Sequence, residues 1–361
     1  MTETADIVLF GTGSFSARIL FDIAATASEP VTVAIAGRNM ARVEWLKTAA
    51  NARAAIFERP VTVIARKADL VDVAAAAEIL SELKPKLVVQ GASAQTSAVI
   101  AAQGNAWTRL VAEGGLGATA VFNALLSVRV AEALKQIGSS AHYINCGYAD
   151  VVNSFIAARG LPITCGVGNV AILATTFMGK LGIRKSGPLK VLSHYQCITP
   201  FRRPASERNG PVPRVWIDNQ EVADVAREFA DVKLTPEPVI DISGANGVPL
   251  MVALAKGRDI LAHVPGPNGL PGGYPVALRG GKLDLDLPAG LSREEAIAWN
   301  AAFEEKSGMV VDPDGKVRHT GALYDALNAV SPDIAKGFHV RDLDTVFAAM
   351  EGLRARLLET T

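Results

Sequence analysis

The chain has 361 residues, of which 49% are hydrophobic and 20% charged, and its 36 basic side chains balance 36 acidic ones. This length suffices for two domains of ordinary size. A net charge of zero excludes a general attraction to nucleic acid or to an anionic membrane surface. Aromatic residues make up only 6% of the chain, too few for a base-stacking surface. We therefore expect a small-molecule substrate, with no nucleic-acid or membrane partner.

The three cysteines, Cys146, Cys165 and Cys197, form no CxxC pair. A low, odd number of cysteines is typical of a reducing compartment. The N-terminal stretch MTETADIVLF lacks the basic region of a signal peptide. No uncharged apolar run reaches the roughly 18 to 20 residues needed to span a membrane. These features predict a cytoplasmic protein.

The first 145 residues alternate between strand and helix patterns. Apolar runs that do not alternate, separated by helices, indicate a parallel sheet covered on both faces. We expect an α/β fold with a Rossmann-type dinucleotide-binding domain over residues 1–147. The expected strands lie at 6–11, 31–37, 61–65, 86–92 and 141–147, and the expected helices at 17–27, 40–54, 70–83 and about 121–137.

The second half mixes helices and strands without a flexible linker or an internal repeat. We expect an α+β domain over residues 148–361 that holds the substrate and mediates homo-oligomerisation. The segment 263–281 is so dense in glycine and proline that it predicts a loop. Helices are expected at 149–160 and 342–359, and strands near 189–198, 211–218 and 260–267.

A glycine-rich motif, GTGSFS, follows the first expected strand and opens the first expected helix. Gly11 permits a tight turn, and Gly13 lets the backbone approach a pyrophosphate at the helix N-terminus, where Ser14 and Phe15 begin the helix. The alternative is a tight turn without a ligand. The context of strand, turn and helix favours a dinucleotide site. Gly91, Ala92 and Ser93, in the stretch Gly91–Ser97, would line the cofactor from the other side.

The second expected strand ends in Gly37, Arg38 and Asn39. An NAD-binding fold places an acid about twenty residues after the glycine motif, where it binds the ribose hydroxyls. A basic side chain at this point accommodates a 2′-phosphate. We therefore predict NADP, with NAD as a possible cofactor, although Arg38 and Asn39 would also suit a helix cap. Asp69, at the end of the third strand, would flank the adenine.

The motifs Gly11-Thr-Gly-Ser and Gly37-Arg-Asn, with "KPKLVVQGAS" further on, resemble the NADP-binding domain of the saccharopine dehydrogenase-like family. The resemblance covers about the first hundred residues. It implies a nicotinamide cofactor and says little about the substrate.

The stretch from Tyr143 to Ile172 resembles the lactate and malate dehydrogenases. The resemblance implies that Asn145 contacts substrate and nicotinamide and that His194 is the catalytic histidine. The family's aspartate partner of the histidine would fall near Ala171. Its substrate-binding arginine would fall near Ala174 or Thr175, so neither side chain is present.

The same region is also similar to the NAD- and manganese-dependent glycosidases. That resemblance would make Cys165 and His194 metal ligands. Two ligands do not make a metal site, and a small buried cysteine is the simpler interpretation of Cys165. No metal is therefore predicted.

His194 and Tyr195 are expected on a strand, with His194 as general acid or base. Arg202 and Arg203 follow and would hold a carboxylate, unless they belong to an exposed basic loop. His263 and Asn268, in the glycine- and proline-rich segment, would form a wall of the substrate site.

The resulting prediction is an NAD(P)-dependent dehydrogenase or reductase. It would transfer hydride between nicotinamide and a small polar substrate, such as a hydroxy or keto acid, an amino acid or an imine. Two alternatives remain open. One is a lyase or hydrolase of glycosidase-like mechanism that uses NAD, and the other is a non-enzymatic NADP-binding sensor.

Overall fold

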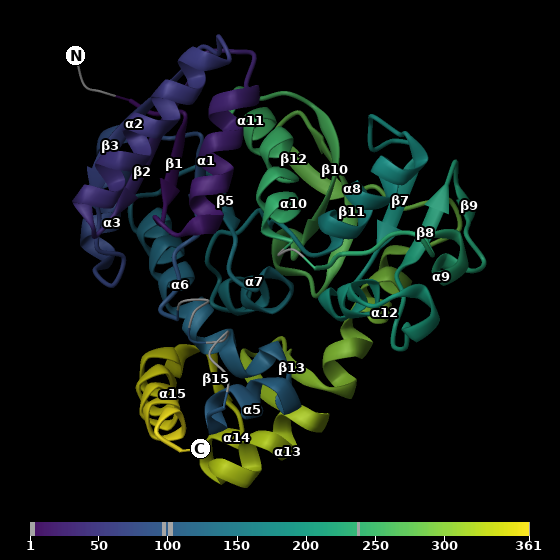
Figure 1. Ribbon diagram of the computed structural model, residues 1–361. Helices are drawn as coiled ribbons and strands as arrows, with labels where there is room; N and C mark the ends of the chain where they lie inside the picture. The colour runs from purple at the N-terminus through teal and green to yellow at the C-terminus, as the bar shows by residue number, and fades with distance from the viewer. Residues whose placement is uncertain (1–3, 96–98, 100–103, 237–238, 361) are drawn as a thin grey trace.

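A six-stranded parallel sheet organises the first half of the chain (Figure 1). The computed structural model describes residues 4–95, 99, 104–236 and 239–360. The strand order is β3-β2-β1-β4-β5-β6, that of a doubly wound dinucleotide-binding sheet. The strands are β1 (Ile7–Phe10), β2 (Val31–Gly37), β3 (Val61–Lys67), β4 (Leu87–Gln90), β5 (His142–Asn145) and β6 (Cys165–Gly166).

Helices cover both faces of this sheet, as the apolar runs predict. Ile7 and Leu9 of β1 face α1, α2 and α11, whereas Val8 and Phe10 face α3 and α6. Each face thus buries its own apolar layer. The helices are α1 (Ser14–Thr26), α2 (Met40–Ile56), α3 (Val73–Leu83), α6 (Ala120–Gln136), α7 (Ala149–Ala158) and α11 (Val248–Lys256).

The carboxyl ends of the central strands meet at one edge of the sheet. Phe10 pairs with Gln90, Gln90 with Asn145, and Asn145 with Gly166. The loops that follow β1, β4, β5 and β6 therefore begin side by side. In open α/β sheets this edge is where ligands bind.

Three small antiparallel sheets follow in the second half. The segment 263–281, expected to be a loop, instead contains most of a hairpin: β10 and β11 pair from Ile260 with Leu278 to Pro265 with Gly273. The strand expected at 189–198 ends at Leu192, and a 3₁₀ helix, η2 (Tyr195–Arg202), follows. The strands are β7 (Leu189–Leu192), β8 (Arg214–Ile217), β9 (Gln220–Glu221), β10 (Ile260–Pro265), β11 (Gly273–Arg279), β12 (Lys282–Leu285), β13 (Gly308–Val311), β14 (Lys316–Thr320) and β15 (Phe338–His339).

The C-terminal helix α15 (Leu343–Leu358) returns to the first half of the chain. Its Phe347 ring lies 5.6 Å from that of Phe122 on α6, and the Arg354 guanidinium stacks over the same Phe122 ring, 4.2 Å from its centroid. The boundary expected at residue 147 stays a prediction, but β6 also extends the first sheet past it. The other helices are α5 (Ala106–Gly114), α8 (Val170–Leu181), α9 (Val225–Glu228), α10 (Ile240–Ala245), α12 (Arg293–Lys306), α13 (Gly321–Val330) and α14 (Pro332–Ala335). The shorter 3₁₀ turns are η1 (Leu116–Thr119), η3 (Ala205–Glu207), η4 (Pro267–Gly269) and η5 (Val340–Asp342).

One helical stretch, Leu116–Gln136, is long and apolar enough to cross a membrane, but 78% of its apolar window is buried inside the protein. It includes α6, whose side chains pack against the sheet and α15. Its apolar character is accounted for by this core position.

Candidate active site

The glycine motif forms a tight turn between β1 and α1. Gly11 has a φ of +112°, and a Cβ there would lie 2.8 Å from the backbone nitrogen of Ala92. Gly13 is the N-cap of α1 and has no side-chain cap. A Cβ on Gly13 would meet no atom within 4 Å. The helix N-terminus is thus open at the point where a pyrophosphate would bind.

The loop after β4 is held beside this turn by Gln90. Its side-chain oxygen accepts from the Ala92 N–H at 2.7 Å, and its side-chain nitrogen donates to the Ala92 carbonyl at 2.8 Å. The buried Ser16 hydroxyl has no hydrogen-bond partner and lies so close to Gly91 that a Cβ there would be 2.4 Å away. Ser93 donates to Asn123 at 3.1 Å. Gly11, Gly13, Gly91 and Ala92 together form a cradle that fits a dinucleotide, whereas Ser97 lies outside the described residues.

Basic side chains lie beside the glycine turn, at the end of β2 and the start of α2. Arg38 is exposed at the end of β2. Asn39 caps α2, because its side-chain oxygen accepts from the Arg42 N–H at 3.1 Å. Arg42, which the sequence analysis did not single out, reaches the Thr12 carbonyl of the glycine turn at 3.4 Å. Asp69 is exposed and accepts from the Val71 N–H.

A cluster of buried ionisable groups lies beyond the same edge of the sheet. His194 is fully buried, and its Nε2 lies 2.9 Å from Glu304 Oε1, although the two atoms are not aligned for a hydrogen bond. His194 Nδ1 accepts from the Gln196 N–H at 3.4 Å. A neutral ring therefore carries its proton on Nε2, toward Glu304. The acidic partner of His194 thus comes from α12, and not from the position near Ala171.

Asp150 is the second carboxylate of this cluster. It is fully buried in the first turn of α7, where Asn169 donates a hydrogen bond to its Oδ2. Its Oδ1 has no hydrogen-bond partner. Burial raises the pKa of Asp150, and nearby His194 opposes this increase. Asp150, which the sequence analysis did not single out, is therefore poised to hold a proton.

A backbone hydrogen bond fixes the Glu304 carboxylate. Its Oε2 accepts from the Met309 N–H at 2.6 Å, which leaves Oε1 toward His194. Asp150 and Glu304 both line a cavity of about 290 Å³ between α7, α12 and β13. His194 does not line it. Asp150 and Glu304 therefore border this cavity from buried positions, whereas His194 does not reach it.

Aromatic rings enclose the cluster. The His194 ring stacks on Phe303 with 4.7 Å between centroids. The Tyr195 ring lies 4.3 Å from His194 and 5.1 Å from Tyr148. Burial raises the pKa of both Tyr148 and Tyr195, so these phenols stay protonated. Tyr148 has a φ of +49°, which no sequence signal indicated.

Asn145 has a supporting position in this structure. It is fully buried, and its side-chain oxygen accepts from the Ser127 hydroxyl and the Gly147 N–H, both at 2.9 Å. Its side-chain nitrogen donates to Asn153 and to the Gly147 carbonyl. Since these bonds use its hydrogen-bonding capacity, Asn145 shapes the turn before α7 without a free atom for substrate.

The predicted substrate residues lie outside this cavity. Arg202 and Arg203 are exposed at the end of η2, and Arg203 donates to Asn209 at 2.8 Å. Asn268 is exposed and donates to the Leu283 carbonyl. His263 accepts from the Val191 N–H at 3.1 Å and lines a different cavity. The structure therefore does not bring these four residues to the Asp150–Glu304 cavity.

Cys165 and His194 do not share a metal-binding cluster. Within the described ranges, no three His, Cys, Asp or Glu side chains are placed to hold a metal ion. Cys165 is a fully buried residue of β6, and burial raises the pKa of its thiol. Its packing agrees with the interpretation as a small core residue.

Comparison with known proteins identifies the fold. No family model and no curated sequence matches the chain. The lactate dehydrogenase of Cryptosporidium parvum, in complex with lactic acid and β-nicotinamide adenine dinucleotide, is similar over 97% of this chain and 99% of its own, with 14% identity and a TM-score of 0.51. The lactate dehydrogenase of Eimeria maxima with NADH and oxamate has 12% identity over 98% of both chains and a TM-score of 0.47.

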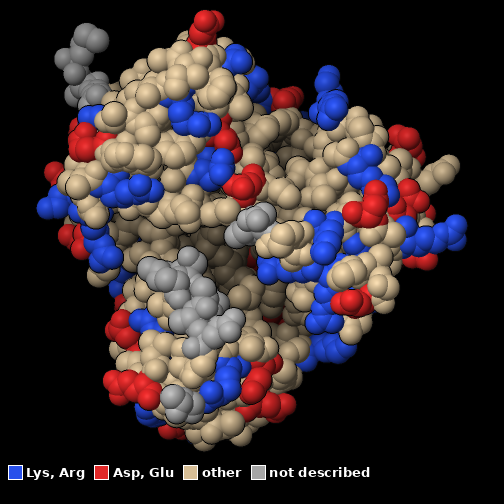
Figure 2. All heavy atoms as spheres, in the orientation of Figure 1, with Lys and Arg blue, Asp and Glu red and all other residues tan. Residues whose placement is uncertain are grey.

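The chain therefore has the α/β fold seen in NAD-dependent dehydrogenases. At the level of fold, the resemblance to the lactate dehydrogenases is confirmed. The resemblance of the N-terminal part to the saccharopine dehydrogenase-like family is not. Figure 2 shows acidic and basic side chains interspersed over one face, which is hollowed between the sheet and the second half of the chain.

Proposed function

We propose that the protein is an NAD(P)-dependent oxidoreductase that acts on a small polar substrate. The observation that carries the proposal is the buried Asp150–His194–Glu304 cluster, two of whose residues, Asp150 and Glu304, line a cavity between α7, α12 and β13. The glycine turn and the Gly91–Ala92 loop lie at the same edge. A dinucleotide cradle and a group that can hold a proton are the two parts that such a reaction needs.

Each part has a defined task. Gly13 and the N-terminus of α1 would hold the pyrophosphate, and the Gly91–Ala92 backbone would lie beside it. The bound nicotinamide supplies or accepts a hydride. The cluster would give a proton to the substrate oxygen or nitrogen, or remove one. Because Asp150 and Glu304 line the cavity and His194 does not, we assign the transfer to a carboxylate, with His194 sharing the proton.

The carboxylates also narrow the substrate class. Asp150 and Glu304 line the cavity and none of its other lining residues carries a positive charge. A site of this kind favours a neutral or amine-bearing substrate over a simple carboxylate, because a second anion would be repelled. Among the predicted substrates, an imine or an amino compound fits the cavity better than a hydroxy acid.

We further propose that Arg38 and Arg42 favour NADP. Both are basic residues beside the glycine turn, where the sequence has no acid. Guanidinium groups bind phosphate through paired, charge-assisted hydrogen bonds. The solved dehydrogenase structures named above contain NAD or NADH. The proposed preference for NADP therefore rests on Arg38 and Arg42 of this chain and not on those structures.

The test is a titration of the purified protein with NADPH and NADH, followed by nicotinamide fluorescence, with Arg38→Asp and Arg42→Ala in parallel. Tighter NADPH binding that is lost in these variants supports the phosphate-reading role. Binding of neither nucleotide would overturn the oxidoreductase assignment. Turnover of imines and keto acids by wild type and Asp150→Asn then tests the cluster, and undiminished turnover in the variant would contradict its role.

A further inference from the structure

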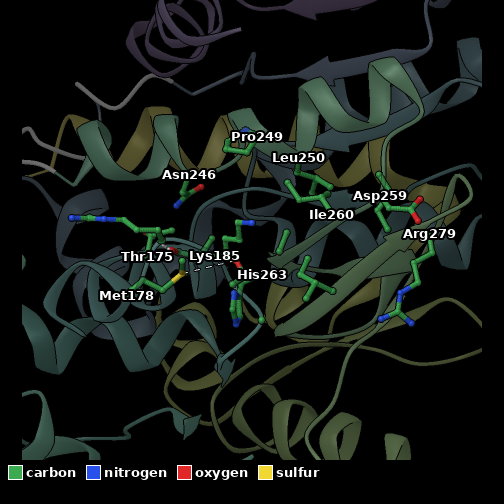
Figure 3. Close-up of a pocket in the computed structure, with 17 residues that line it drawn as sticks. Thr175, Met178, Lys185, Asn246, Pro249, Leu250, Asp259, Ile260, His263 and Arg279 are labelled. Atoms are coloured by element: carbon green, nitrogen blue, oxygen red, sulfur yellow. Dashed lines mark hydrogen bonds between the residues drawn. The ribbon is translucent and has the colours of Figure 1, made fainter. Parts of the chain in front are cut away.

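A second cavity, of about 620 Å³, lies between α8, α11 and the β10–β11 hairpin (Figure 3). None of its lining residues belongs to the glycine turn, the Gly91–Ala92 loop or the Asp150–His194–Glu304 cluster. In Figure 3, Pro249 and Leu250 form one wall, and Met178 and His263 lie on the opposite side. Its volume is within the range of small-molecule sites, about 300 to 1,000 Å³.

The walls of this cavity are apolar. They are formed by side chains from α8, α11 and both strands of the hairpin, among them Ala171, Met178, Leu250, Ile260, Ala262 and Leu278. Such walls favour a hydrocarbon body over a sugar or a nucleotide.

Asn246 is an unpaired polar group at one end of the cavity. Neither its side-chain oxygen nor its side-chain nitrogen has a hydrogen-bond partner, and both atoms are buried. The backbone around it is fixed, since its N–H donates to the Ile242 carbonyl and a Cβ on Gly247 would lie 2.5 Å from Val167. A buried polar atom without a partner is unfavourable, and an occupant that pairs with it removes that cost. Rotation of the terminal amide would present either atom to an occupant of the cavity.

Basic side chains dominate the charge around the cavity. Arg184, Lys185 and Arg279 line it against a single acid, Asp259, whose Oδ1 already accepts from the Gly280 N–H at 2.9 Å. Arg184 and Lys185 are exposed, and neither forms an ion pair within the described part of the chain. An anionic group at the opening would therefore meet cations that have no other partner.

We propose that this cavity binds an amphipathic anion, an organic acid with a hydrocarbon body and one carboxylate. The hydrocarbon part would lie against the walls of α8, α11 and β10. The carboxylate would lie toward Arg184 and Lys185, where Asn246 supplies an amide donor. This site is separate from the proposed nucleotide and substrate sites, so its ligand would be a second small molecule and not the oxidoreductase substrate.

Calorimetric titration of the full-length protein with octanoate tests this proposal. We expect saturable binding that weakens at least tenfold in Asn246→Leu and in the double variant Arg184→Glu/Lys185→Glu. Ala262→Phe, which fills the cavity, should abolish it. Arg341→Glu, an exposed cation on η5, is the matched control and should bind as wild type does. Circular dichroism verifies that each variant is folded.

A parallel titration with NADPH separates this site from the proposed function. The cavity variants should bind the nucleotide as wild type does, and excess NADPH should not displace octanoate. Failure of octanoate to bind wild type would overturn the proposal even if NADPH binds. Displacement of octanoate by NADPH, or unchanged affinity in Asn246→Leu and the double variant, would overturn it as well.

Discussion

At the scale of a single residue, Glu304 places a carboxylate beside His194. The carboxylate lies 2.9 Å from Nε2 and is fixed by the Met309 N–H. A protonated imidazole without this partner would be an isolated buried charge, which is costly. The position of the proton in the cluster therefore depends on Glu304.

Glu304→Gln should slow turnover by roughly a hundredfold while leaving the dissociation constant for NADPH unchanged. The amide oxygen can still accept from Met309, so the fold should be retained. Steady-state kinetics of the variant check this, with Glu294→Gln on the exposed side of the same helix as control. Equal losses in the two variants would contradict a specific role of Glu304.

His263 should make the free energy of unfolding depend on pH. Burial lowers the pKa of His263 from 6.5 to about 4. As the pH falls below 6.5, the unfolded chain takes up a proton that the folded chain does not bind until about pH 4, so the folded state loses stability. A difference of this size corresponds to roughly 3 kcal/mol at pH 4 and is absent above pH 7.

Urea unfolding at a series of pH values between 4 and 7 measures this loss. His263→Gln keeps an oxygen acceptor for the Val191 N–H and cannot titrate. Its free energy of unfolding should decline less steeply with falling pH than that of wild type. His339→Gln on β15 should retain the wild-type slope, and equal slopes in all three proteins would exclude His263 as the source.

The residues of the site show what a sequence can and cannot predict. Gly11, Gly13 and Gly91 were predicted because their spacing expresses a local backbone requirement. Glu304 could not be predicted as the partner of His194, because their proximity depends on how α12 packs against η2. Asp150 falls in the first turn of a helix that was predicted, but its burial and unpaired oxygen arise only from tertiary contacts.

At the scale of elements, the two glycines of the turn between β1 and α1 have different roles. Gly11 has a φ of +112° and no room for a Cβ, whereas Gly13 has open space and an ordinary extended φ of −71°. The first glycine is needed to form the turn. The second leaves the helix N-terminus accessible.

Gly11→Ala should destabilise the protein by at least about 1–2 kcal/mol, because an L-residue is strained at this φ. Gly13→Ala should keep its stability within about 0.5 kcal/mol and lose at least tenfold in NADPH affinity, since the methyl group occupies the space left for the pyrophosphate. Thermal unfolding and nucleotide titration of both variants distinguish these effects. A Gly13→Ala variant with wild-type affinity would place the pyrophosphate elsewhere.

The helices and strands of the first half were predictable because the spacing of apolar residues and the positions of turn residues indicate the same boundaries there. The hairpin of β10 and β11 was missed because Pro275 and the surrounding glycines indicate a loop. The ladder between β11 and β12 begins at Val276, and Pro275 meets that side of the sheet only through its carbonyl, which accepts from the Asp286 N–H at 2.9 Å. The proline therefore falls where fewer ladder hydrogen bonds are needed, a fact that depends on the partner strands.

At the scale of the whole molecule, α15 connects the end of the chain to the helices that cover the first sheet. Met350, Leu353 and Leu357 are buried in the same core cluster as Trp107 and Phe122. The C-terminal helix and the first sheet should therefore unfold together.

Leu353→Ala should lower the free energy of unfolding by about 2–5 kcal/mol and move a single unfolding transition. Leu358→Ala on the same helix, where the side chain is 38% exposed, should change it by about 0.5 kcal/mol or less. Calorimetry measures both. Two separate transitions, with only one affected by Leu353→Ala, would contradict this coupling and would support independent domains.

The return of α15 also has a consequence for synthesis. A chain emerging from the ribosome presents the proposed nucleotide cradle early, while the apolar surface of Trp107 and Phe122 that packs against α15 stays uncovered until α15 has been translated. Glu304 likewise arrives long after His194. The nascent chain thus contains the proposed nucleotide cradle before the proposed proton-transfer cluster is complete, and the side of Trp107 and Phe122 that α15 covers stays exposed until α15 has been translated.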